Sequence, residues 1–268
     1  MPIIGIDKET CTNCKSCIPE CVTLRFGWND KTKEVLFHKN FGCILCGHYV
    51  AVCPVNAVLS EDMPGEPLEF EEIKNIGSIL PYENLFKLIR SKRSIRQYKK
   101  EKVPKLLLNK VIEAMRYAPT GVNIRSLKLT VLSGDKVQLL AEAILKVLLK
   151  SPFVDDGNKL GFRAKINLRK DPIFHKAPHV IIMYSPGLEM VNATIAITHG
   201  MLAAETLGLG TCWIGWAQEP LNGLKEIRET HLGTSDFVSG VFTIGFPDVK
   251  YKRSPTRPVI ETNWIDYE

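Results

Sequence analysis

The chain has 268 residues, of which 45% are hydrophobic and 24% are charged, and its formal net charge is +6. These proportions are typical of an ordinary globular protein of one or two domains. No apolar run approaches the roughly twenty residues that span a bilayer. No stripe interleaves Lys and Arg with aromatic residues, so we expect neither a membrane nor a nucleic acid as partner.

Seven of the eight cysteines lie within the first 53 residues and form two runs. The runs are Cys11-x2-Cys14-x2-Cys17-x3-Cys21 and Cys43-x2-Cys46-x6-Cys53, the second followed by Pro54. They resemble the two half-motifs of a bacterial-type two-cluster ferredoxin, in which each C-x2-C-x2-C-x3-C-P run gives its fourth cysteine to the other cluster. One ligand is missing, because Tyr49 stands where the second run should carry a cysteine.

The register of the runs assigns the ligands of two clusters. A [4Fe-4S] cluster is complete with the thiolates of Cys11, Cys14, Cys17 and Cys53. The second site has Cys21, Cys43 and Cys46, with Tyr49 at its fourth position. Three outcomes stay open there: a [3Fe-4S] centre, a [4Fe-4S] cluster with phenolate, water or His48 on the odd iron, or an empty site. We favour a cluster, because these three cysteines have no other evident role.

Zinc and disulfides are the alternative uses of these cysteines. Zinc accepts the same soft thiolates, and two Cys-x2-Cys pairs alone would favour it. The run of four, with a Cys-Pro closing the second run, favours iron–sulfur clusters. Disulfides fit poorly, because the number of cysteines in this segment is odd and Met1 leads into Ile3 and Ile4 without the basic stretch of a secretory leader. We therefore expect a reducing cytoplasm.

The cysteine-rich segment, residues 1–62, is expected to form a ferredoxin-like domain. Within it, residues 23–28 and 34–38 predict a hairpin around the polar turn 29–32. Residues 63–80 carry prolines and glycines among acidic residues, which predicts a linker. A second domain would then span residues 81–268.

The second domain shows helical and strand patterns in turn. Apolar spacing predicts helices over residues 82–91, 104–119, 136–149 and 193–207. Short apolar runs predict strands over residues 127–132, 180–184 and 238–245. Because strands and helices do not alternate one for one, we expect an α+β fold with a mixed sheet flanked by helices. Residues 151–176 are polar and broken by glycine and proline, which predicts either an active-site flap or an irregular loop without a role.

A basic run follows the first predicted helix of this domain. Lys92, Arg93, Ser94 and Arg96 could bind a phosphate, because guanidinium groups fork onto phosphate oxygens and a hydroxyl can donate a further bond. The same run could equally be a solvated basic face.

Three further segments decide between these interpretations. They are a tight turn at residues 118–123, a glycine-flanked loop at residues 208–215 and a basic stretch at residues 253–257. Together with the basic run, in this order, they resemble the nitroreductase family over residues 81 to about 264. The whole chain resembles nitroreductases that carry an N-terminal two-cluster ferredoxin.

The resemblance implies an intertwined homodimer with FMN in composite sites. It implies that the FMN phosphate and ribityl chain are held by Lys92, Arg93, Ser94 and Arg96, with Arg253 and Arg257 as further phosphate contacts. The residues that would reach the flavin from the partner subunit are Pro119, Thr120, Gly121 and Asn123. The residues that would lie along the isoalloxazine ring are Cys212, Trp213, Ile214 and Gly215.

Some residues depart from the family pattern or have a plainer interpretation. Residues 125–127, Arg-Ser-Leu, replace the glutamine and Pro-Trp of many members, which leaves the substrate open. Trp213 and Trp216 could simply fill the core. Cys212 is better explained as a small apolar residue than as a nucleophile. His199 is better explained as a hydrogen-bonded residue within the dimer than as a catalytic one. We predict no protein acid or base, because the flavin carries the chemistry.

These assignments predict an iron–sulfur flavoprotein oxidoreductase. Electrons would pass from a low-potential donor such as ferredoxin through the clusters to FMN, and on to a nitroaromatic, quinone or similar planar acceptor. Two clusters and a flavin phosphate, each carrying about −2, would offset the positive charge of the chain. The alternatives are an NAD(P)H-driven flavin reductase with accessory clusters, a non-catalytic redox sensor or electron carrier, and a zinc-stapled flavoprotein. For the first alternative, the sequence has no Gly-x-Gly-x-x-Gly motif that would indicate a separate nicotinamide-binding domain.

Overall fold

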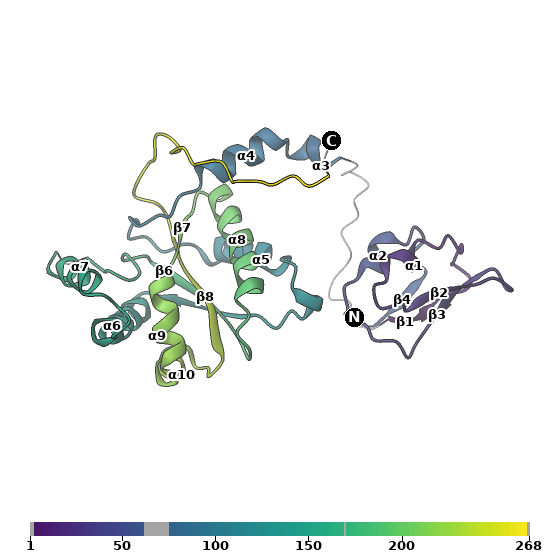
Figure 1. The fold of residues 1–268 in the computed structure, drawn as a ribbon, viewed down its shortest axis with the longest axis horizontal. Helices are drawn as coiled ribbons and strands as arrows, with labels where there is room; N and C mark the ends of the chain where they lie inside the picture. Colours follow the sequence, from purple (N-terminus) through teal and green to yellow (C-terminus); the bar gives the residue numbers. More distant parts are fainter. Residues whose placement is uncertain (1–2, 62–74, 169, 267–268) are drawn as a thin grey trace. The chain divides into compact units, whose positions relative to one another are not determined.

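The computed structural model describes residues 3–61, 75–168 and 170–266 and divides into two compact units (Figure 1). The first unit comprises Met1–Ile79 together with Thr120–Arg125, and the second comprises Leu80–Pro119 and Ser126–Glu268. Most of the predicted linker, residues 63–80, lies outside the described residues. Its described end carries the short helix α3 (Ile76–Ile79).

The first unit is built from two small antiparallel sheets and two short helices. Strand β1 (Ile3–Ile6) pairs with β4 (Val58–Ser60), and β2 (Phe26–Asn29) pairs with β3 (Glu34–Phe37). The helices are α1 (Cys17–Glu20) and α2 (His48–Val52). The predicted hairpin is confirmed as β2 and β3. Its turn is stabilised by the Asn29 side chain, which accepts hydrogen bonds from the backbone N–H groups of Lys31 and Thr32.

A buried arginine organises the loop that precedes the second cysteine run. Arg25 is only 7% exposed, and its guanidinium donates to the carbonyls of Ile3, Lys39 and Phe41. It also lies over the Phe37 ring, with 4.9 Å between the guanidinium carbon and the ring centroid. A planar group with five donors is suited to joining three chain segments in this way. Arg25 therefore ties the segment just before Cys43 to the hairpin and to β1.

The second unit is organised around a four-stranded sheet with the order β5-β6-β8-β7. Its strands are β5 (Lys128–Ser133), β6 (His179–Ser185), β7 (Gly210–Trp213) and β8 (Phe237–Gly245). All three pairings are antiparallel, so the predicted mixed sheet is wrong for these strands. Among the described residues, parallel pairing is confined to one isolated bridge, between Ser94 and Thr211. The sequence patterns located β5, β6 and β8 but missed β7, which is short and lies in the glycine-flanked loop.

Helices cover both faces of this sheet (Figure 1). One face packs against α5 (Lys105–Arg116) and α8 (Met190–Thr206). The other packs against α6 (Asp135–Lys150), α9 (Gln218–Gly223) and α10 (Lys225–Leu232). Alternate residues of β6 enter opposite cores, Val180 on one side and Ile181 on the other, because successive strand side chains point to opposite faces. The α+β expectation is thus confirmed for this unit.

The four predicted helices are confirmed as α4 (Tyr82–Ser91), α5, α6 and α8. The polar segment 151–176, predicted as a flap or irregular loop, contains an additional helix, α7 (Asp156–Asn167). Asp155 starts α7, because its side chain accepts a hydrogen bond of 2.9 Å from the Asn158 N–H. None of the described helices has the length and apolar content that crossing a bilayer requires.

Candidate active site and cysteine sites

The basic run lies alongside strand β7. The Ile95 N–H donates to the Thr211 carbonyl at 2.9 Å, and Ser94 forms the parallel bridge with Thr211. This approach requires glycine at position 210, since a Cβ there would lie 2.5 Å from Cγ1 of Ile95. The chain thereby brings two segments that the sequence assigned to one ligand, the basic run and the 212–215 loop, to the same edge of the sheet.

Partly buried charged side chains lie within the basic run and beside it, at Glu205. Burial lowers the pKa of Lys92, while Glu205 opposes this effect. Burial raises the pKa of Glu205, and Lys92 and Arg93 oppose that rise. Among the described residues, the buried atoms Arg93 Nε, Glu205 Oε1 and Thr211 Oγ1 have no hydrogen-bond partner. Such atoms are uncommon inside proteins, so this cluster is suited to a polar, anionic ligand such as a phosphate.

A cavity of about 550 Å³ opens beside this edge. Its walls combine the predicted residue Arg96 and the loop Cys212–Gly215 with residues from α7, from a turn before β6 and from α9. A Cβ on Gly215 would meet no atom within 4 Å, so the backbone at Gly215 is open to the cavity. The wall residues that sequence reasoning missed are Lys165, Pro172, Ile173, His175 and Glu219.

The segment 151–176 forms part of the cavity wall. Phe162 on α7 packs edge-on against Trp216, with ring centroids 5.4 Å apart and planes at 86°. Ser151 donates to Glu219 at 3.5 Å. The segment is therefore packed beside the cavity and is not irregular throughout, since it contains α7, while its role as a flap stays a prediction. A signal for this order was present in the sequence, since Asp155 is a residue type that often caps the start of a helix, and it caps α7 here.

Cys212, Trp213 and Trp216 differ in their burial. Cys212 is 2% exposed and belongs to a hydrophobic core cluster, as expected of a small apolar residue. Trp213 packs against the core and over Gly240, and it also borders the cavity. Trp216 is 41% exposed, so core filling does not explain it.

The remaining predicted flavin residues lie in two places. The turn Thr120–Arg125, which follows Pro119 and contains Gly121, groups with the first unit. Its Asn123 side chain donates to the carbonyls of Ile44 and Leu45, at 2.9 and 2.7 Å, within the second cysteine run. Ser254 donates to the Arg90 carbonyl at 2.8 Å, which brings the basic stretch with Arg253 and Arg257 to the end of α4. Their contacts with a flavin stay predictions.

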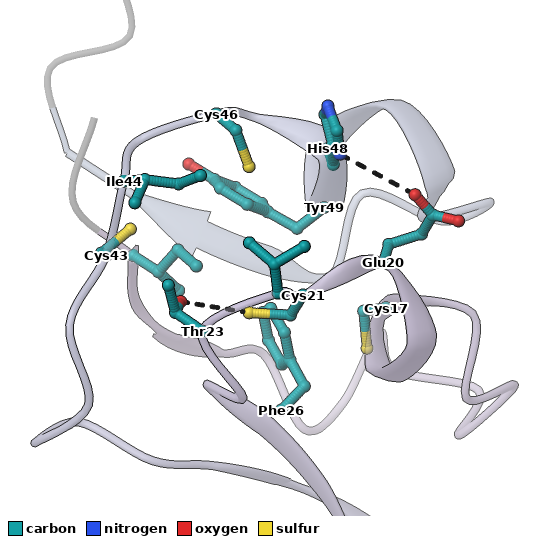
Figure 2. A pocket seen from close by; sticks show the side chains of 12 residues that line it. Cys17, Glu20, Cys21, Thr23, Phe26, Cys43, Ile44, Cys46, His48 and Tyr49 are labelled. Atoms are coloured by element: carbon teal, nitrogen blue, oxygen red, sulfur yellow. Dashed lines mark hydrogen bonds and ion pairs between the residues drawn. The ribbon is translucent and has the colours of Figure 1, made fainter. Parts of the chain in front are cut away.

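The cysteines of the first unit gather around two pockets in the grouping that the spacing predicts. Cys11, Cys14, Cys17 and Cys53 line one pocket. The other is lined by Cys21, Cys43 and Cys46, again with Cys17 at its border (Figure 2). All eight cysteines are free thiols. Within the described ranges, no three Cys, His, Asp or Glu side chains are arranged as ligands of a single metal ion.

Backbone donors and local hydrogen bonds tune individual thiols. Cys21 and Cys53 accept 3.2 Å hydrogen bonds from the N–H groups of Arg25 and Ala57. Burial alone would raise the pKa of Cys21, but bonds from Thr23 and Arg25 outweigh it and lower the pKa. Burial raises the pKa of Cys17 to about 11. Hydrogen bonds to thiolate sulfur are among the features that adjust the potential of an iron–sulfur cluster.

The residue in the missing-ligand position is part of the core. Tyr49 is 5% exposed, and its ring lies 6.4 Å from that of Phe26. Burial raises its pKa, and a hydrogen bond with the Ser60 side chain opposes the rise. The neighbouring His48 turns toward Glu20, with 3.8 Å between Nδ1 and Oε2 (Figure 2). The ring of Tyr49 thus forms a wall of the second cysteine pocket.

Comparison with known proteins agrees with this architecture. The model of the nitroreductase family matches residues 89–246. A nitroreductase with bound FMN from Bacteroides fragilis is 25% identical with a TM-score of 0.56, over 66% of this chain and 98% of that one. A second, from Desulfitobacterium hafniense, is 21% identical with a TM-score of 0.56, over 66% and 97% of the two chains, and shares the fold.

A curated relative, the probable oxidoreductase YjgC of Bacillus subtilis, is 30% identical over 76 residues, which is 24% of this chain. The chain spans only 8% of that relative's length. The fold and the family model define the class of the protein: an α+β oxidoreductase. The chain belongs to the nitroreductase family.

Proposed function

We propose that this FMN-dependent oxidoreductase takes electrons from a low-potential donor such as ferredoxin and passes them through iron–sulfur clusters to the flavin. The final acceptor is a nitroaromatic, a quinone or a similar planar molecule. The observation that carries the proposal is the pair of cysteine-lined pockets in the first unit of a chain whose second unit belongs to the nitroreductase family.

The residues around β7 are suited to FMN. Lys92, Arg93, Ser94 and Arg96 supply cations and a hydroxyl for the phosphate, with Arg253 and Arg257 as further contacts. The open backbone at Gly215 leaves room for the ring, while the Ile214 N–H already donates to the Val241 carbonyl. Bound FMN supplies the conversion between one-electron and two-electron transfer. The FMN in the Bacteroides fragilis relative supports this assignment.

The two cysteine pockets are suited to two clusters of different type. Cys11, Cys14, Cys17 and Cys53 hold a [4Fe-4S] cluster in this proposal. Cys21, Cys43 and Cys46 hold a [3Fe-4S] cluster. The Tyr49 side chain is hydrogen-bonded with Ser60, and His48 pairs with Glu20. These interactions favour a [3Fe-4S] cluster over a [4Fe-4S] cluster with Tyr49 or His48 as its fourth ligand.

The protein acts as a cytoplasmic homodimer in this proposal. Its C-terminal stretch exposes large apolar side chains, with Val259 94% and Ile260 90% exposed in the isolated chain. Such side chains favour coverage by a partner, which a second copy of the chain would provide. None of the eight cysteines, all of which the structure describes, is joined in a disulfide, which supports a reducing compartment.

One preparation tests the cofactors and the direction of electron flow. Anaerobically purified protein is quantified for iron, sulfide and flavin, and reduced ferredoxin is compared with NADH as the donor in stopped-flow bleaching of the flavin. Cys11→Ser should lose iron and abolish turnover from reduced ferredoxin, while Cys212→Ser, in the other unit, should keep the wild-type iron content. Unchanged turnover in Cys11→Ser would overturn the relay, and zinc without sulfide would overturn the clusters.

A further inference from the structure

We propose that His175 donates a proton to the acceptor while it is reduced in the cavity. The inference rests on the proposed flavin-dependent reduction of a planar acceptor. It adds a catalytic side chain where the sequence had indicated none.

His175 is placed where an acceptor would meet the reactive loop. It borders the same cavity as Arg96 and the open backbone at Gly215, and it is half-buried. Among the described wall residues it is the one imidazole, and imidazole is the side chain whose ordinary pKa lies nearest to neutrality. A side chain that can both give up and regain a proton in this pH range is suited to act as the donor.

The turn that carries His175 is held in place from both ends. The Asp171 carboxylate accepts hydrogen bonds from the N–H groups of Ile173, Phe174 and Lys176, at 2.8, 3.1 and 3.1 Å. Ile173 and Phe174 are 1% and 0% exposed, so they anchor the turn in the core. Asp171 is thus a positioning residue for His175.

This turn also forces an unfavourable backbone conformation. His175 and Lys176 both adopt φ of +57°, in the left-handed region that side chains with a Cβ disfavour. Such conformations persist where surrounding structure imposes them, and they concentrate at functional sites. The Asp171 hydrogen bonds and the buried Ile173 and Phe174 hold this conformation, which keeps His175 at the cavity wall.

Charged groups from every neighbouring element act on His175. Burial lowers its pKa, Asp171 opposes this, and Lys165 and Arg96 lower it further. Glu219 also faces the cavity, from α9. Because the pKa is lowered, the protonated fraction is lost as pH rises through a midpoint below the ordinary value of about 6.5. Proton donation should therefore weaken with rising pH over that range.

The step balances for a quinone. With FMN bound and reduced, the flavin would supply the quinone with the two electrons and one proton of a hydride. The imidazolium N–H bond of His175 breaks as an O–H bond forms on the quinone oxygen, which completes the quinol. Solvent then returns a proton to His175.

The test compares two oxidants of the pre-reduced holoenzyme. Menadione takes up protons when it is reduced, whereas ferricyanide takes up electrons alone. His175→Asn tolerates the left-handed backbone, and His175→Gln serves as a second variant. Both should slow single-turnover oxidation by menadione at least tenfold, within the range of about 10²–10⁴ known for general acids, and leave the ferricyanide rate unchanged. The matched control Lys176→Asn changes an exposed side chain of the same turn and should leave both rates unchanged.

Flavin affinity gives a readout that does not depend on turnover. The Kd of FMN for the flavin-free protein, measured by flavin fluorescence, should stay within about twofold in both His175 variants. The wild-type menadione rate should fall as pH rises, and this fall should vanish in the variants. Equal menadione rates in wild type and both variants, or a loss of FMN affinity that accounts for the slower rate, would overturn the role of His175 alone. A wild-type protein that reduces ferricyanide but not menadione would overturn the proposed acceptor class together with this inference.

Discussion

At Gly210 the side chain of Ile95, within the basic run, packs against β7, and Gly210→Ala tests whether that packing builds the flavin site. The new Cβ would lie 2.5, 2.9 and 3.0 Å from Cγ1, Cβ and Cγ2 of Ile95. A rotamer change of Ile95 cannot relieve the clash, because its own Cβ is one of the three atoms. Overpacking of this kind costs about 1–3 kcal/mol, and alanine in a strand regains about 0.5–1 kcal/mol over glycine.

The net loss centres on about 1 kcal/mol, which corresponds to a fall of about 2–4 °C in the unfolding midpoint for a unit of this size. Because relief requires the basic run to move away from Thr211, FMN affinity should also fall. Thermal unfolding followed by circular dichroism and FMN titration by fluorescence measure the two effects. Combining Gly210→Ala with Ile95→Ala removes two of the three clashes and should restore part of the affinity. Gly161→Ala, on α7 with no atom within 4 Å of its Cβ, is the control and should not lower the midpoint. Wild-type stability and FMN affinity in Gly210→Ala would refute the reasoning.

Two further changes probe the first unit. Tyr49→Cys supplies the missing thiolate at the second cysteine pocket, so the EPR signal of an oxidised three-iron centre should disappear and iron content should rise by about one per chain; an unchanged signal would contradict the assigned register. Arg25→Leu leaves the carbonyls of Ile3, Lys39 and Phe41 without their donor, and unpaired buried groups cost about 1–3 kcal/mol each. The expected result is lower stability of the first unit and loss of iron from the Cys43–Cys46 side, measured by iron analysis after mild heating, with Lys33→Leu on the exposed turn as control.

Much of the local structure could be predicted from the sequence. Helices α4, α5, α6 and α8 and strands β5, β6 and β8 follow from apolar spacing, because a buried face repeats at the period of the element. The hairpin of β2 and β3 follows from its polar turn. Strand β7 was not predicted, because it has only four residues, begins with a glycine shortly after another, and is too short to show the alternation of apolar and polar residues that indicates a strand.

The candidate sites divide in the same way. The grouping of the cysteines could be predicted because the spacing of ligands within a run is a local property of the chain. The two pockets are lined by the same two groups of cysteines. Arg96 and the Cys212–Gly215 loop were found through sequence motifs. Lys165, His175 and Glu219 were not, because each is an ordinary residue in its own segment and acquires its place only when α7, the turn before β6 and α9 meet at one cavity.

The sequence by itself determined the periodic elements and the register of the cysteines, because each depends on residues close together in the chain, and it determined the family resemblance through short motifs that occur in a characteristic order. The tertiary structure alone decided the antiparallel order of the sheet, since strand pairing joins residues far apart in sequence. It also decided that the Tyr49 ring packs in the core beside Phe26 and that Asp171 holds His175 at the cavity wall. Those outcomes depend on burial and on hydrogen-bond partners, which exist only once the chain has folded.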